Sequence, residues 1–235
     1  MNIDERYSVN KSLIELGAAG QEKLNKAKIA IVGIGGLGSN CALGLLSLGI
    51  GSITLIDDDT IAPSNLTRQI LYTEEDIGLA KSTTAAKRLK ERNSQINYTA
   101  YQERLTTSNA DKLLLGHDII IDGSDNLVAR IVMDSFCSKN HIPYIYAGVK
   151  GFAGQVSVFN FKKGKSFQSS FSKLENRYGE ENCADSRVIF PLVSLIANIQ
   201  VTQALNILLN RKSILQGYIQ IVDLHNLKFR TFKLR

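Results

Sequence analysis

Cysteine is scarce in this sequence of 235 residues, and its spacing argues against a disulfide framework. Three cysteines occur at unequal intervals, and none belongs to a CxxC pair. An odd number of thiols suits a reducing compartment. Cys41 and Cys137 are flanked by apolar residues in expected helices, so we expect both to be small core residues. The three histidines also lack metal-ligand spacing, and no metal role is assigned to them.

Long apolar runs and basic blocks interleaved with aromatics are missing as well. No run is taken as long enough to span a bilayer, and the opening MNIDERYSVNKS lacks the apolar segment of a secretory signal. We therefore expect a cytoplasmic protein that does not enter a membrane. The formal charge of +6 favours an acidic protein partner or a solvated surface, and no nucleic-acid partner is expected.

The sequence does contain a regular alternation of apolar strands and helices. Strands are expected at 28–32, within 49–57 with an end at Asp57, and at 96–101, 119–121 and 142–148, and helices are expected at 20–27, 36–48, about 79–93 and 127–140. Parallel strands need such crossover helices. The pattern predicts an α/β fold with a Rossmann-like, doubly wound, mostly parallel sheet.

The C-terminal half departs from this alternation. Strands at 154–161, 218–223 and 227–234 lack intervening crossover helices, so we expect them to pair antiparallel and extend the sheet. A largely buried helix is expected to begin near Pro191. One domain is predicted over 1–235, with a nucleotide-binding part at 1–161, a long mobile crossover loop at 162–187, and the helix and antiparallel strands at 188–235.

A glycine-rich turn follows the first predicted strand. Gly33, Gly35 and Gly38 form GxGxxG between a strand and a helix, and Asp57 ends the next strand. Gly33 would permit the tight turn, Gly35 would let the backbone approach a phosphate, and Gly38 would let the helix pack on the strand. The helix N-terminus would face the anion. The alternatives are a glycine-dense turn without a ligand and an NAD-binding turn.

The residues after Asp57 help to decide between these alternatives. RYS and GQEKL precede the turn. After the turn come IDDDTIAPSNLTRQIL, DIGLAK, DGSDNLVAR and GFAGQVSVF, in that order. Together these motifs resemble the MoeB/ThiF/HesA family, relatives of the ubiquitin-activating enzymes, over nearly the whole chain. The SNLxRQ and DNxxxR elements carry most of the specificity.

The resemblance implies a ThiF-type adenylyltransferase domain. Such a domain uses ATP and Mg²⁺ to adenylate the C-terminal Gly-Gly carboxylate of a ubiquitin-like sulfur-carrier protein, with release of pyrophosphate. The pathway would be thiamine, molybdopterin or related sulfur insertion. A homodimer is implied too, and a cysteine desulfurase or a rhodanese is a candidate sulfur donor.

The resemblance also assigns residues. Arg68 and Lys81 would neutralise the triphosphate, Asp57 would hold the ribose, and Asp125 would be the magnesium ligand, a hard oxygen donor. The catalytic set is Arg68, Lys81, Asp125 and Cys183. The nucleotide-binding set is Gly33, Gly35, Gly36, Gly38, Asp57, Asp59, Asn65, Arg68, Gln69, Lys81, Asp125 and Asn126.

Each assignment has a plainer alternative. Arg68 and Lys81 could be solvated surface charges. The Asp125–Asn126 pair could cap the following helix. Asp58 and Asp59 could be loop or capping acids.

Two departures from the family pattern limit what carries over. The family's RYxRQ element places an arginine on the partner subunit's ATP, and here Val9 stands at that place; Arg6 or Lys11 could compensate. The serines of KSFQSSFSK stand where many relatives have a zinc-binding CxxC, so no structural zinc is predicted.

Cys183 lies in the predicted crossover loop at the place of a reactive cysteine in some relatives. Arg187 nearby could favour its thiolate. The alternative is a loop cysteine without chemistry.

Three other functions stay open. The chain could activate a different carboxylate, as in peptide-modifying or tRNA-modifying branches of the superfamily. It could be a binding module without catalysis, or an NAD(P)-dependent oxidoreductase. The last would leave SNLTRQ and Asp125 without a purpose.

Overall fold

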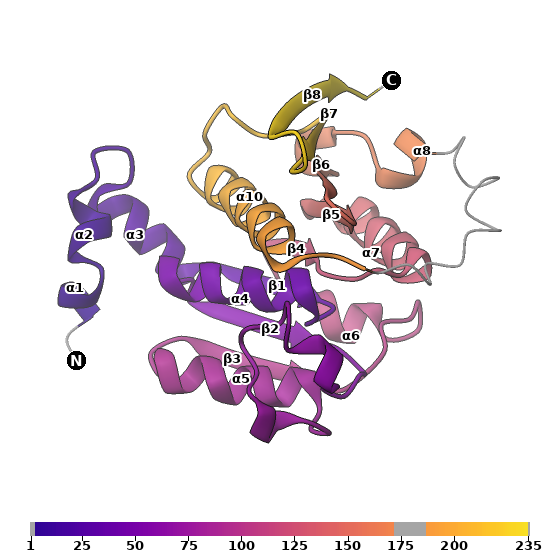
Figure 1. Cartoon of the computed structure of the whole chain (residues 1–235). Coiled ribbons are helices and arrows are strands. Elements are labelled where there is room, and N and C mark those ends of the chain that lie inside the picture. Colours follow the sequence, from indigo (N-terminus) through magenta and orange to yellow (C-terminus); the bar gives the residue numbers. More distant parts are fainter. Residues whose placement is uncertain (1–2, 172–186, 235) are drawn as a thin grey trace.

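Eight strands form one mixed sheet at the centre of the molecule, which a computed structural model describes over residues 3–171 and 187–234 (Figure 1). The strand order is β3-β2-β1-β4-β5-β6-β7-β8. The strands are β1 (Lys28–Val32), β2 (Ser52–Ile56), β3 (Asn97–Tyr101), β4 (Ile119–Asp122), β5 (Tyr144–Lys150), β6 (Ala153–Phe159), β7 (Tyr218–Asp223) and β8 (Lys228–Lys233). The predicted boundaries agree to within a few residues.

The first five strands are parallel, and the last three are antiparallel. This confirms the predicted doubly wound sheet and its antiparallel extension. Strand β1 lies between β2 and β4, so the winding of the chain reverses beside β1. In open α/β sheets, ligands bind outside the carboxyl ends of the strands at such a reversal.

Helices cover both faces of the sheet. On one face lie α3 (Gly17–Lys26), α4 (Gly36–Leu48), α5 (Lys81–Arg92) and α10 (Phe190–Leu208), and on the other α6 (Ala110–Leu114), α7 (Leu127–Asn140) and α8 (Phe167–Phe171). Two short helices, α1 (Ile3–Arg6) and α2 (Ser8–Ser12), precede them. Three 3₁₀ turns lie at Pro63–Asn65, Glu74–Asp76 and Phe161–Lys163. Because both faces are covered, β1 and β2 are almost wholly buried and apolar.

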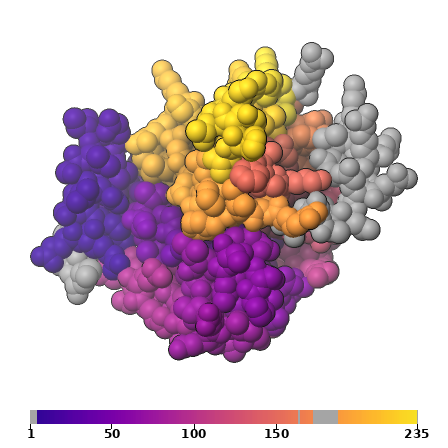
Figure 2. All heavy atoms as spheres, viewed as in Figure 1, coloured from indigo at the N-terminus to yellow at the C-terminus, as the bar shows by residue number. Residues whose placement is uncertain are grey.

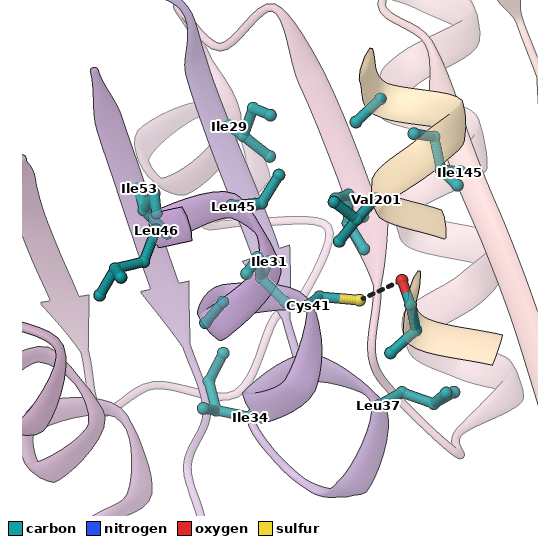
Figure 3. Packing of buried hydrophobic residues seen from close by; sticks show 14 of the residues in the cluster. Ile29, Ile31, Ile34, Leu37, Cys41, Leu45, Leu46, Ile53, Ile145 and Val201 are labelled. Atoms are coloured by element: carbon teal, nitrogen blue, oxygen red, sulfur yellow. Dashed lines mark hydrogen bonds between the residues drawn. The ribbon is translucent and has the colours of Figure 1, made fainter. Parts of the chain in front are cut away.

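Helix α10 packs against α4 although 142 or more residues separate them in the sequence (Figure 3). Val201 lies over Gly44, where a side chain would meet its methyl groups. The Cys41 thiol donates to the Ala197 carbonyl oxygen at 3.7 Å. Cys41 and Cys137 are both buried, as predicted, and burial raises the pKa of each thiol far above its usual value.

The expectation that no run could span a bilayer is wrong by length and composition. Helix α10 has 19 residues and a mean hydropathy of 1.3, which is enough to cross a membrane on those criteria. Half of that stretch is buried within the protein, against α4 and strands β5 and β6. The apolar character of α10 is therefore explained by packing on two sides.

The predicted crossover loop contains regular structure near its start. Helix α8 forms there because the buried carboxylate of Asp134, on α7, accepts hydrogen bonds from the backbone amides of Phe167 and Gln168 at 2.8 and 3.0 Å. The rings of Phe167 and Phe171 also pack on Tyr146. These are contacts with distant elements, so the local sequence pattern could not indicate them.

The N-terminal helices form one flank of the surface, and the C-terminal strands β7 and β8 lie elsewhere on it (Figure 2). Tyr7 holds this flank in place. Its ring packs against Gly49, where a side chain would overlap it, and its hydroxyl accepts a bond from the Asn93 amide at 2.7 Å. Gly49, in the left-handed conformation with φ 75°, ends α4.

Candidate active site

A cleft of about 340 Å³ opens at the carboxyl ends of β1, β2 and β4. Every residue of the predicted nucleotide-binding set except Gly38 lines it. Residues absent from that set line it too: Asp58, Glu103, Arg104, Leu105, Gly123, Ser124 and Arg130. The fold therefore brings residues that are up to about 160 positions apart in the sequence, from Val32 to Val193, into one concave, polar site.

The glycine turn occupies the floor of the cleft. Gly33 has φ 85°, a conformation that favours glycine, and hydrogen-bonds from its amide to the Ile56 carbonyl oxygen at 2.8 Å. A side chain on Gly38 would overlap the carbonyl oxygen of Gly33. Gly123 was not predicted to belong to the site. Its backbone also passes close to the turn, because a side chain on Gly123 would overlap the carbonyl oxygen of Gly33. Three glycines thus let the turn, α4 and the end of β4 meet.

The carboxylate of Asp57 braces this turn from β2. It accepts hydrogen bonds from the amides of Ile34 at 2.6 Å and Asp59 at 2.8 Å. Asp57 is only 8% exposed, and burial raises the pKa of its carboxyl group, although these amides and the charge of Lys81 offset part of the rise. Its position at the end of β2 suits the predicted contact with ribose.

The next two acids hold cations that line the cleft. Asp58 accepts from Nε of Arg104 at 2.9 Å, and Asp59 pairs with Nζ of Lys81 at 2.8 Å. The side chain of Lys81 is 9% exposed and that of Asp59 is 62% exposed. Both acids were considered as loop or capping residues, but here each orients a cation. Carboxylate oxygens of the three consecutive acids lie within 4.8 Å of one another, close enough for a metal ion, but each already has a partner.

The SNLTRQ segment forms the rim above the turn. Asn65 caps its own 3₁₀ turn by accepting from the Ala62 amide at 3.1 Å, and Nη1 of Arg68 donates to the Ser64 carbonyl oxygen at 2.9 Å. The side chain of Arg68 passes over α4, with Cγ 3.7 Å from the position of a Cβ on Gly36. Arg68 and Lys81 therefore face one cleft from two separate segments.

Gln69 is 3% exposed and lies beside the turn. Its Nε2 is 3.6 Å from the position of a Cβ on Gly35, so a phosphate on the turn would lie near a hydrogen-bond donor. Its Oε1 has no hydrogen-bond partner among the residues that the structure describes.

Asn126 caps α7, which was the plainer of its two predicted roles. Its side-chain oxygen accepts from the amides of Val128 at 2.8 Å and Ala129 at 3.3 Å. Asp125, just before it, is exposed and lines the cleft. Among the described residues, no hydrogen bond or ion pair of the Asp125 carboxylate is found. A carboxylate of this kind fits a magnesium ion, which takes hard oxygen ligands.

Arg130 was part of the DNxxxR motif but was given no role. Nε of Arg130 pairs with Asp122 at 3.0 Å, and Nη2 donates to the carbonyl oxygens of Ser124 at 2.9 Å and Ala147 at 3.1 Å. Burial alone would lower the pKa of Arg130, but the carboxylate of Asp122 more than offsets it, and the net pKa is raised. Arg130 thus ties the turn that carries Asp125 to the middle of β5.

The carboxylate of Asp122 accepts three hydrogen bonds besides the one from Arg130. They come from the Ser124 amide at 2.9 Å, the Ser124 hydroxyl at 2.7 Å and the Tyr144 hydroxyl at 3.0 Å. The guanidinium of Arg130 also lies over the ring of Tyr146 at 5.0 Å. The Asp122 carboxylate at the centre of this network is closed to solvent, since its side chain is fully buried, whereas Ser124 and Arg130 line the cleft.

One predicted residue is not described, and one predicted element lies away from the cleft. Cys183 lies outside the described residues. The N-terminal element with Arg6, Val9 and Lys11 is held at the C-terminal end of α4, and a helix of 13 residues separates that end from the glycine turn by roughly 20 Å. Nη2 of Arg6 donates there to the Arg92 carbonyl oxygen at 2.6 Å. The N-terminal element therefore lies away from the glycine turn of its own chain.

Comparison with known proteins agrees with this geometry. The sequence model of the ThiF family matches residues 7–235. The chain belongs to the ThiF family. This confirms the resemblance inferred from the motifs.

Similar proteins carry names that describe adenylyl transfer. This ThiF-family chain is 37% identical to a probable molybdopterin-synthase adenylyltransferase of Porphyra purpurea, over 97% of the chain and 60% of that protein. It is 34% identical to the adenylyltransferase and sulfurtransferase MOCS3 of Anopheles gambiae, over 100% of the chain and 54% of that protein. The chain thus spans little more than half the length of these relatives.

Solved structures share the fold. A crystal structure of PaaA superposes with a TM-score of 0.85 at 25% identity, over 99% of this chain and 83% of that one. A crystal structure of Escherichia coli MccB with ATP superposes with a TM-score of 0.79 at 23% identity, over 91% of this chain and 65% of that one.

Proposed function

We propose that this ThiF-family chain adenylates the C-terminal Gly-Gly carboxylate of a ubiquitin-like sulfur-carrier protein with ATP. The observation that carries the proposal is the convergence of Arg68 and Lys81, from two separate segments, on the cleft that contains the glycine turn. The names of the molybdopterin-synthase relatives support molybdopterin synthesis as the pathway over thiamine synthesis.

The reaction joins two anions. A carboxylate oxygen attacks the α-phosphorus of ATP, a new P–O bond forms, the bond to the bridging oxygen breaks, and pyrophosphate leaves. Catalysis of this kind depends on positioning and on neutralising charge. The backbone amides at the start of α4 would receive phosphate oxygens, Arg68 and Lys81 would neutralise them, and Asp57 would accept from the ribose hydroxyls.

Asp125 would hold Mg²⁺, which would supply charge neutralisation at the phosphates when bound. Arg130 and Asp122 keep the Asp125 turn in place through Ser124. Asn126 would contribute by fixing the start of α7 beside it.

The partners follow from the same proposal. The carrier protein is the substrate, an acidic surface on it would complement the charge of +6, and a cysteine desulfurase or rhodanese would deliver sulfur. Cys183 would accept the outer sulfur of a persulfide on the donor, which leaves as a thiolate, or it would displace AMP from the carrier adenylate and form a thioester. A cytoplasmic homodimer would place the N-terminal element of one copy near the cleft of the other.

The test is ATP–pyrophosphate exchange with a carrier ending in Gly-Gly, and mass spectrometry of the carrier adenylate. Exchange should depend on the carrier and vanish when the two terminal glycines are removed. Arg68→Ala should lower the exchange rate by about 100-fold, as loss of one electrostatic group does. Exchange that ignores the carrier, or binding of NADH without ATP, would reject the proposal.

A further inference from the structure

The cleft extends past Asp57 to the loop that follows β3. Glu103, Arg104 and Leu105 line this end, with Ile56 from β2. Ile56 and Leu105 are buried and apolar, whereas Arg104 stands at the rim with 70% of its side chain exposed. This end therefore offers an apolar inner side and a cationic outer side.

Two ion pairs hold the charged residues of this end in place. Nε of Arg104 donates to Asp58 at 2.9 Å. Glu103 accepts from Lys112 at 2.6 Å, and this bond lowers the pKa of Glu103. A guanidinium that is already oriented loses little freedom when a ligand binds.

The geometry of the sheet indicates which part of a nucleotide reaches this end. Neighbouring strands lie about 4.8 Å apart, so the end of β3 is roughly 10 Å from the end of β1, where the glycine turn begins. The carboxylates of Asp57 and Asp58 lie between them and repel phosphates. With the triphosphate on the turn and the ribose at Asp57, the base is directed toward β3.

We propose that Arg104 is the residue that recognises the nucleobase, by stacking its guanidinium plane, oriented by Asp58, on the face of the purine. Ile56 and Leu105 give the base an apolar surface on the inner side. Arginine suits this role because its guanidinium is planar and weakly hydrated. The inference rests on the proposed function.

The test compares two halves of the ligand by calorimetry on the full chain. AMP carries the base without the β- and γ-phosphates, and tripolyphosphate carries phosphates without the base. Arg104→Ala should weaken AMP binding about two- to fivefold and change tripolyphosphate binding less than twofold. Arg68→Ala should show the reverse pattern. Arg230→Ala, an exposed arginine on β8 outside the cleft, should bind both ligands like the wild type.

A second pair of variants separates shape from charge. Arg104→Lys keeps the charge without the plane and should bind AMP like Arg104→Ala. Asp58→Asn releases the guanidinium and should give a smaller loss, again confined to AMP. Circular dichroism should show all variants folded, since Arg104 is largely exposed.

Three results would overturn the inference: unchanged AMP binding in Arg104→Ala, equal weakening of both ligands, or full AMP binding in Arg104→Lys. Each of these leaves the proposed function intact if the wild type binds ATP. A wild type that binds neither ATP nor AMP would reject the proposed function, and the inference with it.

Discussion

Two ion pairs lie on opposite sides of the cleft and differ in the exposure of the carboxylate. In the Arg130–Asp122 pair the acid is fully buried and accepts four hydrogen bonds. In the Lys81–Asp59 pair the acid is 62% exposed. A closed pair cannot exchange its partner without leaving a buried charge, whereas an open pair can release its cation to a ligand. The first therefore supports the site, and the second is suited to act in it.

Breaking the closed pair should give the largest effect. Arg130→Met leaves the Asp122 carboxylate buried without its counter-charge, so the free energy of unfolding should fall by about 3–5 kcal/mol, measured by urea denaturation. The double variant Asp122→Asn with Arg130→Met should regain part of this loss because no charge stays buried. A loss below about 1 kcal/mol in the single variant would contradict the comparison.

Removing the cation of the open pair should damage activity and spare the fold. Lys81→Met keeps the apolar stem but loses a charge at the phosphates, so exchange of pyrophosphate should slow by about 100-fold. The free energy of unfolding should change by less than about 1 kcal/mol. A matched loss of stability would mean that both pairs serve the fold.

Removing the charge of the exposed acid, Asp59, should have a smaller effect than removing Lys81, and it should strengthen ATP binding. In Asp59→Asn the phosphates no longer compete with a carboxylate for Lys81, so the dissociation constant for ATP should fall about two- to fivefold, corresponding to an exposed pair of up to about 1 kcal/mol. Calorimetry measures the change. Weaker ATP binding in this variant would show that Asp59 itself contacts the ligand.

The pH dependence of ATP binding should shift in opposite directions in Lys81→Met and Asp59→Asn. Burial raises the pKa of Asp57, Lys81 lowers it, and Asp59 raises it. The acid limit of binding should therefore move to higher pH in Lys81→Met and to lower pH in Asp59→Asn. Titrations between about pH 4 and 7 would detect the shifts, and movement in one common direction would refute the assignment to Asp57.

The raised pKa of Asp57 also determines how this residue makes the stability of the fold depend on pH. A carboxyl group with a raised pKa in the folded protein favours the fold at low pH, and this contribution is lost as the pH rises through the folded pKa. Asp57 is thus kept at some cost to the fold, which is expected of a residue that serves a ligand.

Elements with strong local signals were predicted almost residue by residue. Helix α4 and helix α7 have the predicted bounds because a glycine turn or an Asn cap begins each, and a left-handed residue follows each. Helix α8 was missed because its start is capped by Asp134 from another element.

The site divides in the same way. Residues inside motifs, such as Arg68 and Lys81, could be named from the sequence. Arg104 could not, because it follows β3 in a polar loop without a pattern, and only the parallel register of β2 and β3 brings it to the cleft. Gly123 could have been found, since a glycine directly after a buried strand indicates a close approach of backbone.

Because α10 packs on α4, the N-terminal part of the chain depends on the C-terminal part to cover its apolar surface. A side chain on Gly36, at the start of α4, would lie 3.1 Å from Val193, so helix α10 packs directly beside the glycine turn. A fragment that stops at residue 161 would leave the apolar side of α4 open to water and should aggregate. Two fragments expressed together should instead reassemble, which would make the chain a candidate for a split reporter whose halves regain function only on association.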